Sequence, residues 1–151
     1  MNGAAQASSE TASSQCHMAC SGSATESCGG GGLMDVYYTG TLTTKAPAAV
    51  QTTNLPSSWT YESCISDSIN ARSLPVQENL SDNDATTCLN YCATNGYTAA
   101  GLEYSGQCMC GSPGDVTASA ATTSTQCTMT CSGDSNFICG GPGAMNLYYF
   151  S

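Results

Sequence analysis

Hydrophobic positions in this chain form short alternating segments rather than long periodic runs. Residues 59–65 alternate aromatic or apolar side chains with polar ones, and this period of two predicts a β-strand. The stretches 97–104 and 107–111, separated by a Ser-Gly turn, predict a β-hairpin. A closing strand is expected at residues 144–150. The pattern therefore predicts a short antiparallel sheet.

One main helix is predicted between these strands. Asp82 or Asp84 can cap a helix over residues 85–94, and the Asn-Gly pair that follows it supplies a left-handed stop. A single helical turn is expected at residues 125–131. Together these elements predict a small α+β domain with one principal helix and a short antiparallel sheet.

A repeat becomes visible when the chain is compared with itself at an offset of 111 residues. Residues 13–38 then lie over residues 124–149, and fourteen of the 26 aligned positions are identical. Both copies read C-x3-C-x7-C-G-G followed by a short apolar and aromatic tail. We therefore expect residues 1–38 to be the C-terminal part of a truncated module and residues 59–151 to be a complete one.

The segment between the two copies, residues 39–58, has eight Ser or Thr among its twenty residues, together with two prolines and one charge. Such a composition offers little apolar surface to offset the entropy of ordering the chain. It predicts an extended, O-glycosylated linker.

Eleven cysteines in 151 residues indicate a disulfide scaffold made in an oxidising compartment. The complete module holds an even number, which fits four disulfides, although the sequence leaves their pairing open. These eight are Cys64, Cys88, Cys92, Cys108, Cys110, Cys127, Cys131 and Cys139. The first copy holds an odd set, Cys16, Cys20 and Cys28, so at least one partner is expected upstream of Met1. One free thiol per chain, or a disulfide-linked dimer, is therefore predicted.

Charge argues against two classes of partner. The net charge is −9, and Lys45 and Arg72 are the only basic residues, so there is no basic patch for phosphates or an anionic membrane. Neither nucleic acid nor membrane contact is therefore expected. The first ten residues lack the charged and apolar regions of a secretory signal, so a disulfide-rich chain of this kind is expected to be a fragment. The cysteine spacing could also suit a zinc site, but an oxidising compartment and an even count favour disulfides. No metal or cofactor is therefore predicted.

The motifs between Trp59 and Phe150 resemble the WSC domain, which occurs in fungal cell-wall sensors and in multi-domain secreted fungal enzymes. The resemblance rests on Trp59-Thr60-Tyr61-Glu62-Ser63-Cys64, Asp67-Ser68, Arg72-Ser73-Leu74, Cys88-x3-Cys92, Gly96-Tyr97, Ala100-Gly101-Leu102-Glu103-Tyr104, Cys108-Met109-Cys110-Gly111, Cys127-x3-Cys131-Ser132-Gly133-Asp134 and Cys139-Gly140-Gly141. It implies a secreted or wall-anchored extracellular glycoprotein with tandem WSC modules. The resemblance also implies a carbohydrate-binding module, whose expected partner is a cell-wall polysaccharide of the β-glucan, chitin or xylan class.

A neutral polysaccharide offers C–H faces and hydroxyl groups, so its site needs exposed aromatic rings beside polar side chains. The candidates for sugar binding are Trp59, Tyr61, Tyr97, Tyr104, Asp67, Arg72, Glu103 and Asn146. For Tyr97 we favour packing in the core, and for Trp59 the core and an exposed position are given equal weight. Tyr61 and Tyr104 are expected to be exposed. For Arg72, a structural salt bridge to Asp67 or Glu103 is favoured over direct contact with sugar.

No catalytic residue is predicted. Glu62, Asp67 and Glu103 could supply the two carboxylates of a glycoside hydrolase, but so small a module has little room for a cleft between them. The sequon at residues 79–81 predicts N-glycosylation of Asn79, in an exposed loop before the helix.

The sequence therefore predicts non-catalytic binding of cell-wall polysaccharide, weak at each module and multiplied by repetition. A structural or mechanosensing spacer, whose WSC modules contact one another rather than sugar, is the first alternative. A module that targets a fused secreted hydrolase or oxidase is the second.

Overall fold

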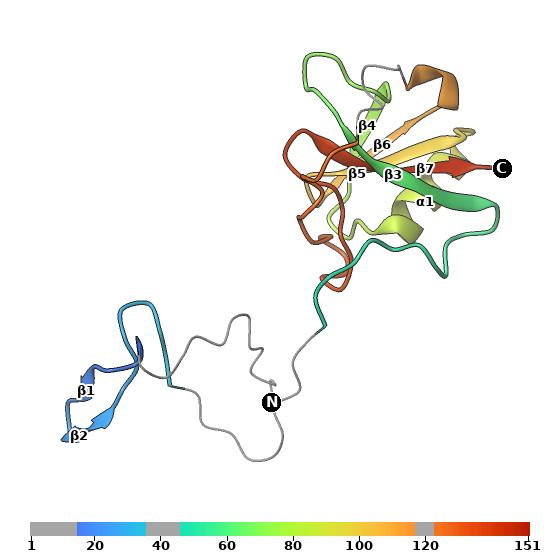
Figure 1. Cartoon of the computed structure of the whole chain (residues 1–151). Coiled ribbons are helices and arrows are strands. Elements are labelled where there is room, and N and C mark those ends of the chain that lie inside the picture. Colours follow the sequence, from blue (N-terminus) through green and yellow to red (C-terminus); the bar gives the residue numbers. More distant parts are fainter. Residues whose placement is uncertain (1–14, 36–45, 117–122) are drawn as a thin grey trace. The chain divides into compact units, whose positions relative to one another are not determined.

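The computed structural model describes residues 15–35, 46–116 and 123–151. The chain divides into two compact units, Met1–Ala46 and Pro47–Ser151, which are described one at a time (Figure 1). Parts of the predicted first module and of the predicted linker lie outside the described residues. Within those residues, no helix has the length and apolar character needed to span a membrane.

The second unit is built on a five-stranded antiparallel sheet with the strand order β3-β7-β5-β6-β4. Its strands are β3 (Trp59–Ser66), β4 (Val76–Asn79), β5 (Ala99–Glu103), β6 (Gln107–Gly111) and β7 (Ala144–Phe150). The strands predicted at 59–65, 107–111 and 144–150 are confirmed. The strand predicted at 97–104 is shorter, because Tyr97 still belongs to the helix stop and Tyr104 has a positive φ. The edge strand β4 has no counterpart among the predictions.

Helix α1 (Ala85–Thr94) has the predicted bounds. Of the two possible caps, Asp84 is the one used, and its Oδ1 accepts the backbone N–H of Thr87 at 2.7 Å. Gly96 ends the helix with a φ of 81°, a conformation that glycine adopts without steric cost. The α+β class with one principal helix is thus confirmed for the described part of the chain.

The helical turn predicted at residues 125–131 is wrong, because this segment contains no helical residue. Its backbone N–H groups bond to other segments instead of to one another. The N–H of Met129 donates to the carbonyl of Gly140 at 2.9 Å, and that of Cys131 donates to the carbonyl of Phe137 at 3.0 Å. A 3-10 turn, η2 (Pro113–Asp115), lies after β6.

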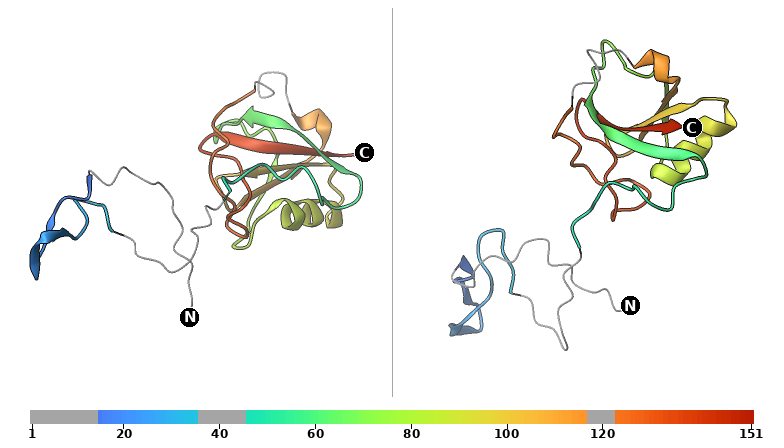
Figure 2. Two further views of the ribbon diagram at one scale, coloured as in Figure 1. Left: turned by 60° about the horizontal axis from the view of Figure 1, so that its bottom comes forward. Right: turned by 45° about the vertical axis from the view of Figure 1, so that its right-hand side comes forward.

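Helix α1 covers one face of the sheet and contacts β5 and β6 (Figure 2). Two disulfides, Cys88–Cys108 and Cys92–Cys110, join the helix to β6. The core on this side includes Leu89 of the helix. Burial of these side chains against the sheet, with two covalent links, fixes the helix on this face.

The other face of the sheet has a second core, formed by Ile65, Leu74, Ala99, Met109, Met145 and Leu147. Leu74 comes from the loop between β3 and β4, and it is fully buried. The loop therefore covers this face of the sheet opposite α1.

The predicted linker extends too far toward the C-terminus. Residues 47–58 belong to the second unit, where Val50 and Leu55 pack against the α1-side core. The backbone N–H of Ile138 donates to the carbonyl of Ala49 at 2.9 Å, and the Tyr148 hydroxyl donates to the carbonyl of Gln51 at 2.9 Å. A few apolar side chains within a Ser/Thr-rich segment are enough to anchor it.

The eight cysteines predicted to form disulfides do so, in four pairs within the second unit. Besides the two helix links these are Cys64–Cys127 and Cys131–Cys139. In the first unit, Cys20 pairs with Cys28, and Cys16 remains free.

The first unit repeats the local structure of residues 126–146. Its strands β1 (Ala19–Cys20) and β2 (Ser23–Ser27) form a small hairpin. The N–H of Met18 donates to the carbonyl of Gly29 at 2.9 Å, which is the bond that Met129 makes to Gly140 in the second unit. The repeat seen in the sequence therefore extends to backbone hydrogen bonds.

Candidate functional site

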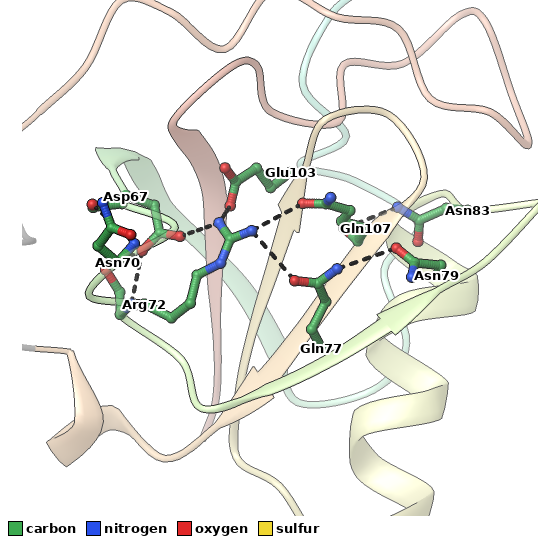
Figure 3. Close-up of polar contacts among 10 residues, drawn as sticks. Asp67, Asn70, Arg72, Gln77, Asn79, Asn83, Glu103 and Gln107 are labelled. Atoms are coloured by element: carbon green, nitrogen blue, oxygen red, sulfur yellow. Dashed lines mark hydrogen bonds and ion pairs between the residues drawn. The ribbon is translucent and has the colours of Figure 1, made fainter.

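Arg72 lies at the centre of a polar cluster on the sheet face opposite α1 (Figure 3). Its Nη1 donates to Oδ2 of Asp67 at 2.7 Å and to Oε2 of Glu103 at 2.6 Å. The side chains of Asp67 and Glu103 are 0% and 4% exposed, and that of Arg72 is 19% exposed. The predicted salt bridge to either carboxylate is therefore a salt bridge to both.

Asp67 also anchors the loop that covers this face. Its Oδ1 accepts the backbone N–H of Ser73 at 2.7 Å and the hydroxyl of Ser73 at 2.8 Å. Burial raises the pKa of Asp67, but the hydrogen bonds from Arg72 and Ser73 outweigh burial and hold this pKa below its ordinary range. For Glu103, burial and the neighbouring Asp67 outweigh Arg72, and its pKa is raised.

Three carboxamide side chains lead from Arg72 to the edge of the sheet, and we call Gln77, Asn79 and Gln107 the amide strip. Asn79 in β4 is the cross-strand partner of Gln107 in β6, and Gln107 is the partner of Glu103 in β5. Residues paired in this way share one face of the sheet. Gln77 and Asn79 are exposed, whereas Gln107 is half-buried.

Hydrogen bonds join the strip to Arg72. Its Nη2 donates to Oε1 of Gln77 at 3.3 Å and to Oε1 of Gln107 at 3.5 Å. Gln77 in turn donates from Nε2 to Oδ1 of Asn79 at 3.2 Å (Figure 3). The network leaves a row of polar groups facing solvent, of the kind that can bond to sugar hydroxyls.

The turn between β5 and β6 carries another feature of the candidate site, the exposed aromatic ring of Tyr104. Tyr104 directly follows Glu103, and it is 55% exposed. Tyr104 and Ser105 have φ values of 46° and 65°, in the left-handed region that bulky residues rarely adopt. Strain of this kind persists only where the surrounding structure enforces it, and it gathers at functional sites.

Hydrogen bonds from the side chain of Asn83 hold the Tyr104 turn in its conformation. Asn83 is fully buried, and its Nδ2 donates to the carbonyls of Ser105 at 3.0 Å and Gln107 at 3.4 Å. The N–H of Ser105 donates to the carbonyl of Cys139 at 3.1 Å. The turn is therefore bonded to the segment before α1 and to the loop closed by the Cys131–Cys139 disulfide. These bonds fix the backbone that carries Tyr104.

Burial removes Asn146 and Trp59 from the sugar-binding candidates. Asn146 is 0% exposed, and its Oδ1 accepts the N–H of Gly140 at 2.6 Å. In the first unit, Oδ2 of Asp35 accepts the N–H of Gly29 in the same way, at 2.8 Å. Trp59 is 5% exposed and packs edge-on against Phe150, so it closes the core.

Tyr61 and Tyr97 are half-buried and pack against the α1-side core. Tyr61 lies edge-on to the ring of Tyr148, with the ring centroids 5.2 Å apart. Burial raises the pKa of Tyr61. Of the eight sugar-binding candidates, the structure joins Arg72, Asp67 and Glu103 by ion pairs, and Tyr104 follows Glu103 in the chain.

The carboxylates do not form a hydrolytic pair. Asp67 and Glu103 share one nitrogen of Arg72 and are closed off from solvent, whereas glycoside hydrolysis needs two carboxylates across a cleft that admits the substrate. The sulfur atoms of Cys88, Cys92 and Cys108 lie within 4.8 Å of one another, but each belongs to a disulfide and is not a free thiolate for a metal.

The model of the WSC domain matches residues 61–141. This range contains α1, the strands β4, β5 and β6, the Arg72 cluster and the Tyr104 turn. The chain belongs to the WSC domain family. The WSC family is one of non-catalytic modules that occur in extracellular or surface proteins.

Relatives of this WSC chain include much longer proteins. A WSC domain-containing protein of Arthroderma benhamiae is 39% identical over 90% of this chain, but the match spans only 15% of that protein. A protein of Chaetomium globosum named for a fungistatic metabolite is 36% identical over 97% of this chain and 68% of its own length. Xylosyltransferase oxt of Drosophila melanogaster is 31% identical over 74% of this chain and 12% of its own length.

Sequence reasoning did not place Gln77, Gln107 or Asn83 in the candidate site, and it singled out Asn79 only as a glycosylation site. The segment Val76-Gln77-Glu78-Asn79 has one apolar residue, so no hydrophobic alternation marks it as a strand. Two of its polar side chains join Gln107 only through the register of β4 on β6. Asn83 stands between two aspartates and looks like part of a cap.

Proposed function

We propose that this WSC chain is a non-catalytic module that binds neutral cell-wall polysaccharide of the β-glucan, chitin or xylan class. Tyr104 would stack on the C–H face of a sugar ring, and the amide strip with Arg72 would bond to its hydroxyls. The single observation that carries the proposal is the exposed ring of Tyr104 in a strained turn fixed by Asn83 and Cys139.

The electrostatics support a neutral ligand. Arg72 is the one cation in the described part of the second unit, and two carboxylates neutralise it. A sugar with an acidic group would therefore find no free positive charge at this surface. Hydroxyl groups need only the donors and acceptors that the carboxamides provide.

Retention on insoluble β-glucan, chitin and xylan tests the proposal. The full chain should be retained on at least one of these polymers, and Tyr104→Ala should lose most of that retention. Tyr104→Phe, which keeps the ring and loses only the hydroxyl, is the matched control and should remain bound. Failure of the unaltered chain to bind any of the three would refute the proposal.

The same proposal places the chain outside the cell, in a secreted or wall-anchored glycoprotein. The five disulfides suit an oxidising compartment. Neighbouring WSC modules are proposed as further partners, because the first unit repeats the hydrogen bonds of residues 126–146. Repetition would multiply a weak affinity at each module.

A targeting role beside a fused enzyme is the second candidate. It is favoured by the likeness to a xylosyltransferase, of which the matched segment forms 12%. The full-length gene tests this candidate, since it should encode a catalytic domain on the same chain. A gene made only of WSC modules and linkers would instead favour the spacer interpretation.

A further inference from the structure

The edge strand β4 ends at the one Asn-x-Ser/Thr sequon of the chain, Asn79-Leu80-Ser81. Asn79 and Ser81 are both exposed. An oligosaccharide can be attached to such an asparagine when the chain passes through a secretory compartment. The same asparagine is the outer member of the amide strip.

The side chain of Asn79 already lies against the strip. Its Oδ1 accepts a hydrogen bond from Nε2 of Gln77 at 3.2 Å, and its cross-strand partner is Gln107 (Figure 3). Nδ2 of Asn79 is bonded to the same carbon as Oδ1. A sugar on this nitrogen therefore begins beside the groups that bond to Gln77.

We infer that Asn79 carries an N-glycan whose first sugars lie over the amide strip. In the transfer, Asn79 Nδ2 forms a bond to C1 of the first N-acetylglucosamine of a polyprenyl-diphosphate-linked oligosaccharide. The bond from C1 to the diphosphate oxygen breaks, and the diphosphate leaves with the electron pair while the amide gives up a proton. The new sugar places hydroxyl groups where Gln77 and Gln107 can bond to them.

The consequence for binding rests on the proposed function. If the strip is the polar part of the polysaccharide site, the module's own glycan competes with the polymer for the same amides. The glycosylated form then binds several-fold more weakly than the bare form. Glycosylation at Asn79 would thus lower the affinity of the module for the cell-wall polysaccharide.

A matched pair of variants distinguishes the effect of the glycan from that of the Asn79 side chain. Ser81→Ala abolishes the sequon and leaves Asn79 intact, whereas Ser81→Thr keeps the sequon. The full chain and both variants are secreted from a eukaryotic host, and intact mass and peptide mapping locate the glycan. NMR then compares the side-chain amide resonances of Gln77 and Gln107 in the three proteins, with those of the buried Gln51 as internal control.

We expect a glycan on Asn79 in the unaltered chain and in Ser81→Thr, and shifted Gln77 and Gln107 resonances relative to Ser81→Ala. Absence of the glycan, or unchanged resonances in its presence, overturns the inference. Retention on the polymers is measured on the same preparations, and Ser81→Ala should be retained several-fold better. Equal retention of both forms overturns the competition. If no form is retained while the resonances shift, the placement of the glycan stands and the proposed function fails.

Discussion

Tyr104 combines two properties that normally exclude each other, a large exposed aromatic ring and a left-handed backbone conformation. Its φ of 46° costs an L-residue roughly 1–2 kcal/mol. The ring is 55% exposed, so its packing against the rest of the chain offsets little of this free energy. Hydrogen bonds to Ser105 from Asn83 and from Ser105 to Cys139 hold the turn. The proposed stacking of this ring on a sugar would give the strained conformation a functional reason.

The variant Tyr104→Gly tests whether the aromatic ring contributes to the stability of the fold. Glycine adopts the same φ without strain but adds entropy to the unfolded chain, so the free energy of unfolding should stay unchanged or rise by up to about 1 kcal/mol. Urea denaturation of the variant and of the unaltered chain measures this. A loss of stability greater than about 1 kcal/mol would show that the ring is part of the core.

The Arg72 cluster should make stability depend on pH in two opposite ways. The pKa of Asp67 is lowered, so its contribution is present above the ordinary aspartate range, near about 4, and is lost as the pH falls through the lowered value. The pKa of Glu103 is raised, so its contribution is present below the ordinary glutamate range and is lost as the pH rises through the raised value.

Two amide substitutions test this assignment. The stability difference between the unaltered chain and Asp67→Asn should grow as the pH rises from about 3 to about 6, because the ionised carboxylate is the form that Arg72 and Ser73 stabilise. The difference for Glu103→Gln should shrink over the same range. Denaturation midpoints measured across the range give both slopes, and slopes of the same sign would contradict the assignment.

At the scale of elements, what could be predicted depended on how local the signal was. Helix α1 is marked by Asp84 before it and Gly96 after it, and both act within a few residues of the helix. The strand β4 lacks hydrophobic alternation and is defined only by pairing with β6, far along the chain. The amide strip therefore could not be read from the sequence. Residues 47–58 look like a linker because Val50 and Leu55 are few among the polar residues.

The conformation of segment 123–131 also depends on partners that are distant in the sequence. Ser124 donates its N–H to the carbonyl of Cys64 at 2.9 Å, and Cys127 is bonded to Cys64 by a disulfide. The sequence analysis expected a helical turn at residues 125–131. The disulfide decides the path of the segment, and its pairing was open at the level of sequence.

Removing the Cys64–Cys127 link should have a large effect on stability. The two cysteines are 63 residues apart, and closing so long a loop reduces the entropy of the unfolded chain by the equivalent of about 4 kcal/mol on the loop-entropy model. Both side chains are half-buried, so the cavity left by alanine is small. The double variant Cys64→Ala with Cys127→Ala, measured by thermal denaturation, should unfold well below the unaltered chain. Cys16→Ala is the control and should leave the midpoint unchanged.

At the scale of the whole molecule, the odd number of cysteines follows from the repeat. Cys16 stands where Cys127 stands in the second unit, and Cys127 is bonded to Cys64. Residues 1–15 contain no cysteine that could take the place of Cys64. The other two cysteines of the first unit pair as their counterparts do. The free Cys16 therefore aligns with a cysteine whose disulfide partner has no counterpart within residues 1–15.

A thiol titration in denaturant without reductant should find one reactive thiol per monomer, and peptide mapping should place the label on Cys16. A disulfide-linked dimer through Cys16 would show no thiol and twice the mass. Label on any other cysteine would contradict the pairing described above.

Mapping of the ligand surface by NMR tests the central claim most directly. The full chain, labelled with nitrogen-15, is titrated with soluble oligosaccharides of β-glucan, chitin and xylan. With at least one of them, the backbone amides of residues 104–107 and the side-chain amides of Gln77 and Gln107 should shift together as the sugar is added. Shifts confined to the opposite edge of the sheet, at β3, or no shifts with any of the three sugars, would contradict the account.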